Sequence, residues 1–116
     1  GWLSRKELVE LYDRATLICI PSWFETYGQV AIEAMRRGLP IVATDAGALD
    51  EHLDEACAWQ VPAMDLAALA TALETALANP SERQRRASRA LVRAASHGGW
   101  SDRVPAFREL YSALIP

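Results

Sequence analysis

The sequence predicts an α/β fold, with a Rossmann-like parallel sheet of about three strands and about six flanking helices. Helical stripes of apolar residues alternate along the chain with short apolar, β-branched runs, in the order α-β-α-β-α-β-α-α-α. These runs lack the alternation of a half-exposed strand, which is typical of parallel strands covered on both faces. The 116 residues are enough for one domain with a real core.

The composition narrows the class of protein. Hydrophobic residues make up 51% of the chain and charged residues 23%, which excludes a disordered protein. The formal net charge of −3 argues against a nucleic-acid partner held by electrostatics. No apolar run approaches the roughly 18 residues that cross a bilayer, and we expect no signal peptide. Cys19 lies in an apolar run, where a buried, inert thiol is expected. We therefore expect a cytoplasmic protein.

The first helix and strand have clear boundaries in the sequence. Ser4 and Glu7 have the spacing of a capping box, so a helix is predicted from there to about residue 15. The apolar run Thr16–Ile20 (TLICI) follows and ends at Pro21. This run predicts a strand that is buried on both faces.

The middle of the chain predicts two more strands. A helix starts near Gly28 and ends at Gly38, where a glycine followed by a proline is the usual helix C-terminus. Ile41–Thr44 (IVAT) predicts a second buried strand. After a turn, residues 48–53 predict a short helix, and residues 58–61 (AWQV) predict a third, weaker strand.

Three helices are predicted to complete the chain. Asp65 caps the first of them, which Asn79-Pro80 ends. Ser81 caps the next, which runs to His97-Gly98-Gly99. That helix carries five arginines, which we expect to form a solvated face: Arg83, Arg85, Arg86, Arg89 and Arg93.

The last helix is predicted to begin at Ser101 or Asp102 and to hold Pro105 in its first turn, where proline is tolerated. Its apolar residues have helical spacing, and we expect the stripe to be buried. The stripe consists of Val104, Phe107, Leu110, Tyr111 and Leu114.

The candidate ligand site lies around the helix that starts near Gly28. Glu25 and Glu33 lie eight residues apart, on either side of this turn. A helix N-terminus presents unpaired N–H groups and a partial positive charge, which favour a phosphate. Taken alone, Glu25 also fits a surface loop, and Glu33 fits a solvated pair with Arg37. His52 and His97 are isolated in the sequence, so we expect no metal site.

The segment around the two glutamates carries a set of elements in a fixed order: Pro21-Ser22, Glu25, Tyr27-Gly28, Glu33-Ala34-Met35, Gly38-Leu39-Pro40 and Glu51. In this order and spacing the segment resembles the C-terminal, donor-binding domain of the retaining glycosyltransferases called group 1 or family 4. These enzymes have the GT-B arrangement of two Rossmann-like domains, and a Glu-x7-Glu motif is their mark. The resemblance extends weakly to residues 1–4 and to the last helix.

The resemblance implies roles for single residues. The first glutamate of the family's motif contacts hydroxyl groups of the donor sugar, a role that falls on Glu25, our candidate catalytic residue. The second binds the ribose hydroxyls of the nucleotide, a role that falls on Glu33. Ionised carboxylates accept strongly from such hydroxyl pairs. The donor-binding backbone N–H groups are expected to be those of Thr26, Tyr27, Gly28 and Gln29.

The resemblance also implies what the protein works with. The substrate is a nucleotide diphosphate-sugar, the acceptor is a glycan or a lipid-linked molecule, and no cofactor or metal is expected. A lipid-linked acceptor implies work at the inner face of the membrane. Two alternatives stay open: a folded but catalytically inert nucleotide-binding fragment, and a GT-B sugar-nucleotide epimerase or phosphorylase.

Residues 1–116 correspond in this resemblance to the second half of the donor-binding domain. The family's basic diphosphate ligands lie further upstream in that domain, and the acceptor-binding N-terminal domain is also absent from this segment. We therefore expect a three-stranded sheet with an exposed edge. The fragment is expected either to pair this edge with another copy of itself or to be ordered only within a larger assembly.

Overall fold

The computed structural model describes residues 1–97 and 100–115. Three parallel strands form one sheet in the order β1 (Ile18–Ile20), β2 (Ile41–Thr44) and β3 (Trp59–Val61). Ile18 lies opposite Ile41, and Val42 opposite Trp59. The predicted Rossmann-like α/β fold is confirmed.

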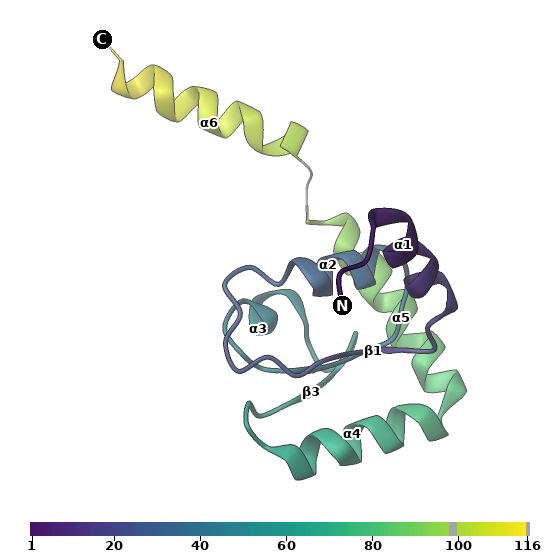
Figure 1. Cartoon of the computed structure of the whole chain (residues 1–116). Coiled ribbons are helices and arrows are strands. Elements are labelled where there is room, and N and C mark those ends of the chain that lie inside the picture. The colour runs from purple at the N-terminus through teal and green to yellow at the C-terminus, as the bar shows by residue number, and fades with distance from the viewer. Residues whose placement is uncertain (98–99, 116) are drawn as a thin grey trace.

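Six helices among the described residues accompany this sheet, in the predicted order (Figure 1). They are α1 (Arg5–Arg14), α2 (Gln29–Arg36), α3 (Ala48–His52), α4 (Leu66–Ala78), α5 (Pro80–Ala95) and α6 (Trp100–Leu114). The predicted capping box is formed at the start of α1. The Glu7 N–H donates to the Ser4 hydroxyl over 3.3 Å, and the Ser4 N–H donates to the Glu7 carboxylate over 2.7 Å.

The central strand β2 is buried on both faces, as its sequence predicts. Ile41 and Ala43 belong to the larger core cluster, which includes buried residues of α2 and α5. Val42 points to the opposite face and packs in a second cluster, which contains Trp59 and the small residues of α4. Strand side chains alternate between faces, so each residue of β2 meets one of two helix layers.

Strand β1 is less buried than predicted. The strand begins at Ile18 and not at Thr16, and of its three residues only Ile20 is fully buried. Within the described residues β1 is an edge strand that pairs only with β2, and α4 packs on β2 and β3. The face that carries Cys19 is therefore only half covered. Burial is still sufficient to raise the pKa of the Cys19 thiol.

Helix α5 begins two residues earlier than predicted. Its N-cap is Asn79 and its first residue is Pro80, so the prediction that Ser81 caps the helix is wrong. The physical reason is that proline suits the first helical position, where its missing N–H would have no helical partner. The predicted end of α5 at Gly98-Gly99 lies outside the described residues.

The arginines of α5 are not all solvated, which corrects the sequence prediction. Arg83 donates to the carbonyls of Ala76 and Leu77, each over 2.6 Å, and so caps the C-terminus of α4. Arg86 donates to backbone carbonyls of the segment before β3 and lies 4.6 Å from the ring centre of Trp59. Helix termini and loops leave carbonyl groups without partners, and these guanidinium groups satisfy them.

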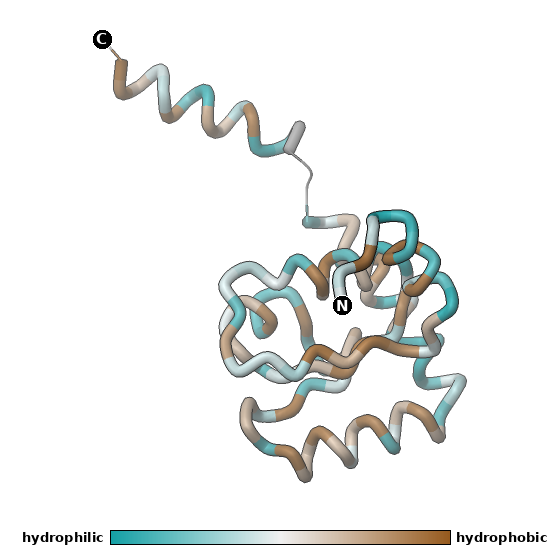
Figure 2. Tube along the Cα trace, in the orientation of Figure 1, coloured by the Kyte–Doolittle hydropathy of each residue, from teal (hydrophilic) through white to brown (hydrophobic). Residues whose placement is uncertain are grey.

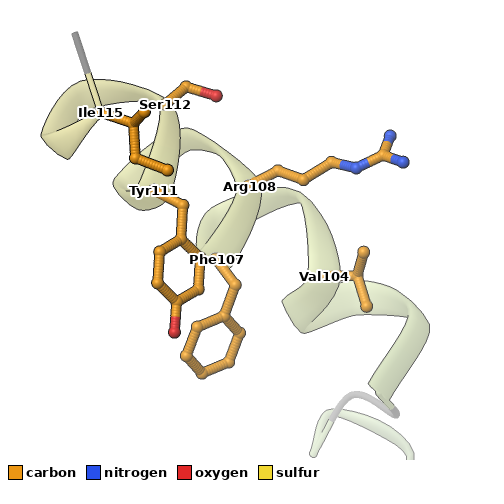
Figure 3. A pocket seen from close by; sticks show the side chains of 6 residues that line it. All are labelled: Val104, Phe107, Arg108, Tyr111, Ser112 and Ile115. Carbon is orange, nitrogen blue, oxygen red and sulfur yellow. The ribbon is translucent and has the colours of Figure 1, made fainter.

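Helix α6 also differs from its prediction. It begins at Trp100, so Pro105 is its sixth residue and lies beyond the first turn. Its apolar stripe is exposed, from 47% at Val104 to 69% at Leu114. Figure 1 shows the helix standing apart from the sheet, and Figure 2 shows brown apolar segments along it. Figure 3 shows a shallow hollow on this helix, lined by Val104, Phe107, Arg108, Tyr111, Ser112 and Ile115.

The stripe is exposed because no described element packs against it, and periodicity alone cannot tell which element will cover a stripe. Among the helices that the structure describes, none has the length and apolar character to cross a membrane.

Candidate functional site

The loop between β1 and α2, residues 21–28, is fixed through its carbonyl groups, and we name it the motif loop. Three of these carbonyls bind groups of the next β-α unit, at the carboxyl edge of the sheet, where ligands of such folds bind. The Thr44 hydroxyl donates to the Ser22 carbonyl (2.6 Å), the Ala48 N–H to the Glu25 carbonyl (2.9 Å) and His52 Nε2 to the Tyr27 carbonyl (2.6 Å).

Two glycines allow this close packing. Gly47 has φ +56°, and a Cβ at this position would lie 2.4 Å from the carbonyl oxygen of Glu25. No residue with a side chain fits there without a shift of the motif loop. Gly28 has φ +75° and ends the loop as the N-cap of α2. Glycine adopts this left-handed conformation without the steric cost that a Cβ would add.

The Glu25 side chain turns back to the backbone of its own loop. Its Oε1 accepts from the Tyr27 N–H over 3.4 Å. The N–H groups of Gly28, Tyr27 and Thr26, in that order of effect, hold the pKa of Glu25 below its ordinary value. Of the four N–H groups predicted to face the donor, that of Tyr27 thus binds the Glu25 carboxylate, and those of Gly28 and Thr26 also lower its pKa. The N–H of Gln29 is not among them.

Glu33 lies in the second turn of α2, half-buried, and its carboxylate accepts from two side chains. The Tyr12 hydroxyl of α1 donates to Oε2 over 3.3 Å, and the Gln29 amide donates to Oε1 over 3.5 Å. Burial, and then the nearby Glu33 charge, raise the pKa of Tyr12. Arg37 pairs with Asp13 over 3.1 Å, so the solvated Glu33–Arg37 pair that the sequence also allowed is not formed.

The structure brings together residues that the sequence prediction did not connect. Tyr12 precedes Glu33 by 21 residues and His52 follows Tyr27 by 25, so no local spacing links them. The turn at Gly47 was visible in the sequence, but its approach to Glu25 was not. Tertiary contacts of this kind leave no periodic signal. Within residues 1–97 and 100–115, no three His, Cys, Asp or Glu side chains are grouped to hold a metal ion.

A family model described as "Glycosyl transferases group 1" matches residues 1–92 of the chain. The chain belongs to the group 1 glycosyl transferases. A glycogen synthase from Mycobacterium tuberculosis is 34% identical over 114 residues, which are 97% of this chain and 28% of that protein. An MMP alpha-(1->4)-mannosyltransferase from Mycolicibacterium hassiacum is 39% identical over 100 residues, 84% of this chain and 24% of the relative.

Solved structures agree with this membership. The sucrose-phosphate synthase from Thermosynechococcus elongatus superposes with a TM-score of 0.86 and 30% sequence identity, over 98% of this chain and 29% of that one. The Anabaena protein HepE has a TM-score of 0.83 at 23% identity, which shows the shared fold. This group 1 chain thus spans about a quarter to a third of the length of these relatives.

Proposed function

We propose that the protein containing this chain transfers a sugar, with retention, from a nucleotide diphosphate-sugar to an acceptor. Residues 1–116 would form part of its donor-binding domain. The observation that most supports this function is the arrangement of peptide groups in the motif loop. The carbonyls of Ser22, Glu25 and Tyr27 are bound to the β2–α3 unit, and N–H groups converge on a carboxylate. Converging N–H groups at a helix N-terminus form a receptor for a phosphate.

The two glutamates have separate roles in this proposal. Glu33 binds the ribose hydroxyls, and the Tyr12 hydroxyl and the Gln29 amide hold its carboxylate in place. Glu25 gives up its contact with the loop N–H groups when the donor diphosphate arrives, and then accepts from hydroxyls of the sugar. The protein contributes positioning and stabilises the leaving diphosphate with fixed N–H dipoles.

Donor kinetics of the full-length protein test these roles. Glu33→Ala should raise the donor KM by about 10- to 100-fold, because each lost charge-assisted hydrogen bond is worth roughly 1.5–3 kcal/mol. Glu25→Ala should lower kcat more than it raises KM, because sugar contacts matter most as charge develops at the anomeric carbon. Glu74→Ala, an exposed glutamate on α4, is the matched control. Wild-type kinetics in both motif variants would contradict the proposal.

The 116-residue chain alone should transfer no sugar, since the acceptor-binding part and further diphosphate ligands lie elsewhere in the proposed protein. A product assay with the purified chain tests this, and turnover free of contaminants would contradict it. The same assay on the full-length protein separates transfer from the alternatives, since an epimerase yields a new nucleotide-sugar and a phosphorylase yields a sugar phosphate. An inert fragment yields no product in either form.

Self-association of the isolated chain is a further part of the proposal. Edge strand β1 and the exposed stripe of α6 both offer surface to a second copy. Sedimentation at micromolar concentration should show a dimer or a larger species. A compact monomer that binds no apolar dye would contradict this.

The expected conditions of the reaction complete the proposal. Transfer needs no metal, so dialysis against EDTA should leave the rate unchanged, and a loss restored by Mg²⁺ would contradict this. The reaction takes place in the cytoplasm, with a glycan acceptor or a lipid-linked one at the inner face of the membrane. Fractionation of cells and co-sedimentation with anionic vesicles distinguish the two acceptor locations.

A further inference from the structure

Two histidine rings lie side by side at the motif loop. His52 is the last residue of α3, and His97 follows the end of α5. His52 Nδ1 lies 3.0 Å from His97 Nε2, and the ring centres are 5.0 Å apart. The other nitrogen of each ring contacts a backbone carbonyl oxygen. His52 Nε2 lies 2.6 Å from the Tyr27 carbonyl oxygen, and His97 Nδ1 lies 3.0 Å from the Arg93 carbonyl oxygen. One chain of hydrogen bonds thus connects α5 to the motif loop.

The partners of this chain fix its number of protons. A carbonyl oxygen only accepts, so the outer nitrogen of each ring must donate. The contact between the rings needs one more proton, since two bare nitrogens have no hydrogen to share. Three protons on two imidazoles make one of them a cation. When the pair holds only two protons, one of the three contacts is lost.

Charged groups from several elements face the pair. Arg93 donates to the His52 carbonyl over 2.6 Å, and Arg36 of α2 donates to the His97 carbonyl over 3.1 Å. The carboxylates in the same network are Asp54, which pairs with Arg93 over 2.8 Å, and Glu25, which accepts from the Tyr27 N–H; Asp50 and Glu51 are exposed on α3 itself. Both guanidinium groups bind the backbone of the pair and leave the ring nitrogens to each other and to the carbonyls.

The bond to Tyr27 acts on the donor site through a single peptide unit. The Tyr27 carbonyl and the Gly28 N–H belong to one planar trans peptide, so they point in opposite directions. A bond that holds this carbonyl therefore also aims this N–H. The Gly28 N–H has the largest effect in lowering the pKa of Glu25. The His52 ring also packs closely against this turn, because a Cβ on Gly28 would lie 3.0 Å from the ring.

We propose that His52 is a positioning residue of the donor site. His97 holds the His52 ring in place through a proton that the two rings share. This inference rests on the proposed function, since the anion bound by the Gly28 N–H is taken to be the donor diphosphate. Donor affinity is highest when the pair is protonated. It falls as the pH rises, because one of the three contacts opens when the pair loses its third proton. The donor KM changes more than kcat, because neither ring touches a reacting atom.

The first test measures the donor KM and kcat of the full-length protein against pH, with UDP-glucose, GDP-glucose and ADP-glucose as probes. The wild-type KM for the donor that is used should rise about tenfold between roughly pH 5.5 and 8.5. His97→Ala should give a raised KM that no longer depends on pH in this range. His52→Gln keeps a donor for the Tyr27 carbonyl, so it should recover part of the affinity lost in His52→Ala, without the pH dependence.

The second test observes the imidazoles of the wild-type protein directly. In ¹⁵N spectra of the wild-type protein, the two rings should titrate together, as a coupled pair does. The resonances are assigned by their loss in His52→Gln and His97→Gln. Independent titration of the rings, or a wild-type pH profile in His97→Ala, would overturn the proposal.

Glu33→Ala separates this inference from the proposed function. That variant should weaken donor binding at every pH and leave the histidine titration unchanged. If the rings titrate as a pair but Glu33→Ala binds the donor as tightly as the wild type, the proposed function is wrong and the coupling of the rings stands. If Glu33→Ala behaves as expected and the histidine variants keep the wild-type profile, the positioning role is wrong.

Discussion

Helices α2 and α6 both have an apolar face, but only the face of α2 is buried in this structure. In α2 the apolar residues Ala31, Ala34 and Met35 are entirely buried in the main core cluster. In α6 the apolar side chains from Val104 to Leu114 keep about half or more of their surface exposed. Both helices have the spacing that predicts a buried face, but only α2 has a sheet and a neighbouring helix, α5, to cover it. Spacing therefore tells which face of a helix is apolar and not whether anything packs on that face.

The largest expected effect contrasts one side chain from each helix in the 116-residue chain. Met35→Ala removes a fully buried side chain and should cost about 2–5 kcal/mol of unfolding free energy. Phe107→Ala removes a side chain that is 49% exposed and should cost less than about 0.5 kcal/mol. Urea unfolding measures both. A large loss for Phe107→Ala would show that the α6 stripe is covered in solution, and the same pair in the full-length protein tells whether another segment covers it.

The next effect concerns backbone conformation within the packed part. Gly47→Ala adds a Cβ that would lie 2.4 Å from the Glu25 carbonyl oxygen, so it should cost about 2–3 kcal/mol and raise the donor KM. Gly38→Ala is the matched control, because Gly38 also has a positive φ but no atom lies within 4 Å of its added Cβ. It should cost about 1 kcal/mol and leave donor binding unchanged. Equal costs at the two glycines would contradict the tight contact between the turn and the motif loop.

A smaller effect distinguishes two arginines that lie one turn apart on α5. Arg93 donates to the carbonyls of His52 and Glu51 and to Asp54, so Arg93→Met should cost about 1–2 kcal/mol, reduced by its partial exposure. Arg89→Met changes an exposed arginine of the same helix and should stay within about 0.5 kcal/mol. Thermal unfolding measures both variants. If the two arginines proved equivalent, the bonds of Arg93 would contribute nothing in solution.

The smallest effect should appear only as a pH dependence. Hydrogen bonds from Arg85 and then Arg86 lower the pKa of Glu82 to about 2. A lowered pKa stabilises the fold above the ordinary glutamate range, and the benefit is lost as the pH falls toward 2. Glu82→Gln should therefore be slightly less stable than the wild type at neutral pH, and the difference should disappear in acid. Unfolding curves from about pH 2 to 7 measure it, and a difference that persists at pH 2 would contradict this cause.

Much of the fold was present in the sequence because it depends on local patterns. The capping box at Ser4 and Glu7, the all-apolar run Ile41–Thr44 and the cap at Asp65 each need only a few neighbouring residues, and each is confirmed. The order of helices and strands follows from the alternation of these patterns. The start of α2 near Gly28 was also predicted from the sequence, and the helix begins at Gln29 with Gly28 as its N-cap.

Two of the errors of prediction concern partners that lie far away in the sequence. Five arginines on one helix predict a solvated face, yet Arg83, Arg86 and Arg93 reach carbonyls of α4, of the segment before β3 and of α3. The run Thr16–Ile20 predicts a strand buried on both faces, but β1 begins at Ile18 and only Ile20 in it is buried. The type of a side chain, whether guanidinium or apolar, does not specify which backbone segment will pack beside it.

The candidate site shows the same division between local features, which the sequence predicts, and contacts between distant residues, which it does not. The sequence by itself determined the two carboxylates, the glycine turn and the N–H groups between them, because these lie within nine residues of one chain segment. Only the tertiary structure decided that Tyr12 holds Glu33, that Gly47 touches the Glu25 carbonyl, and that two histidines 45 residues apart meet at the motif loop. The physical reason is that chemistry at a helix start is local, whereas its orientation is set where the ends of neighbouring strands meet.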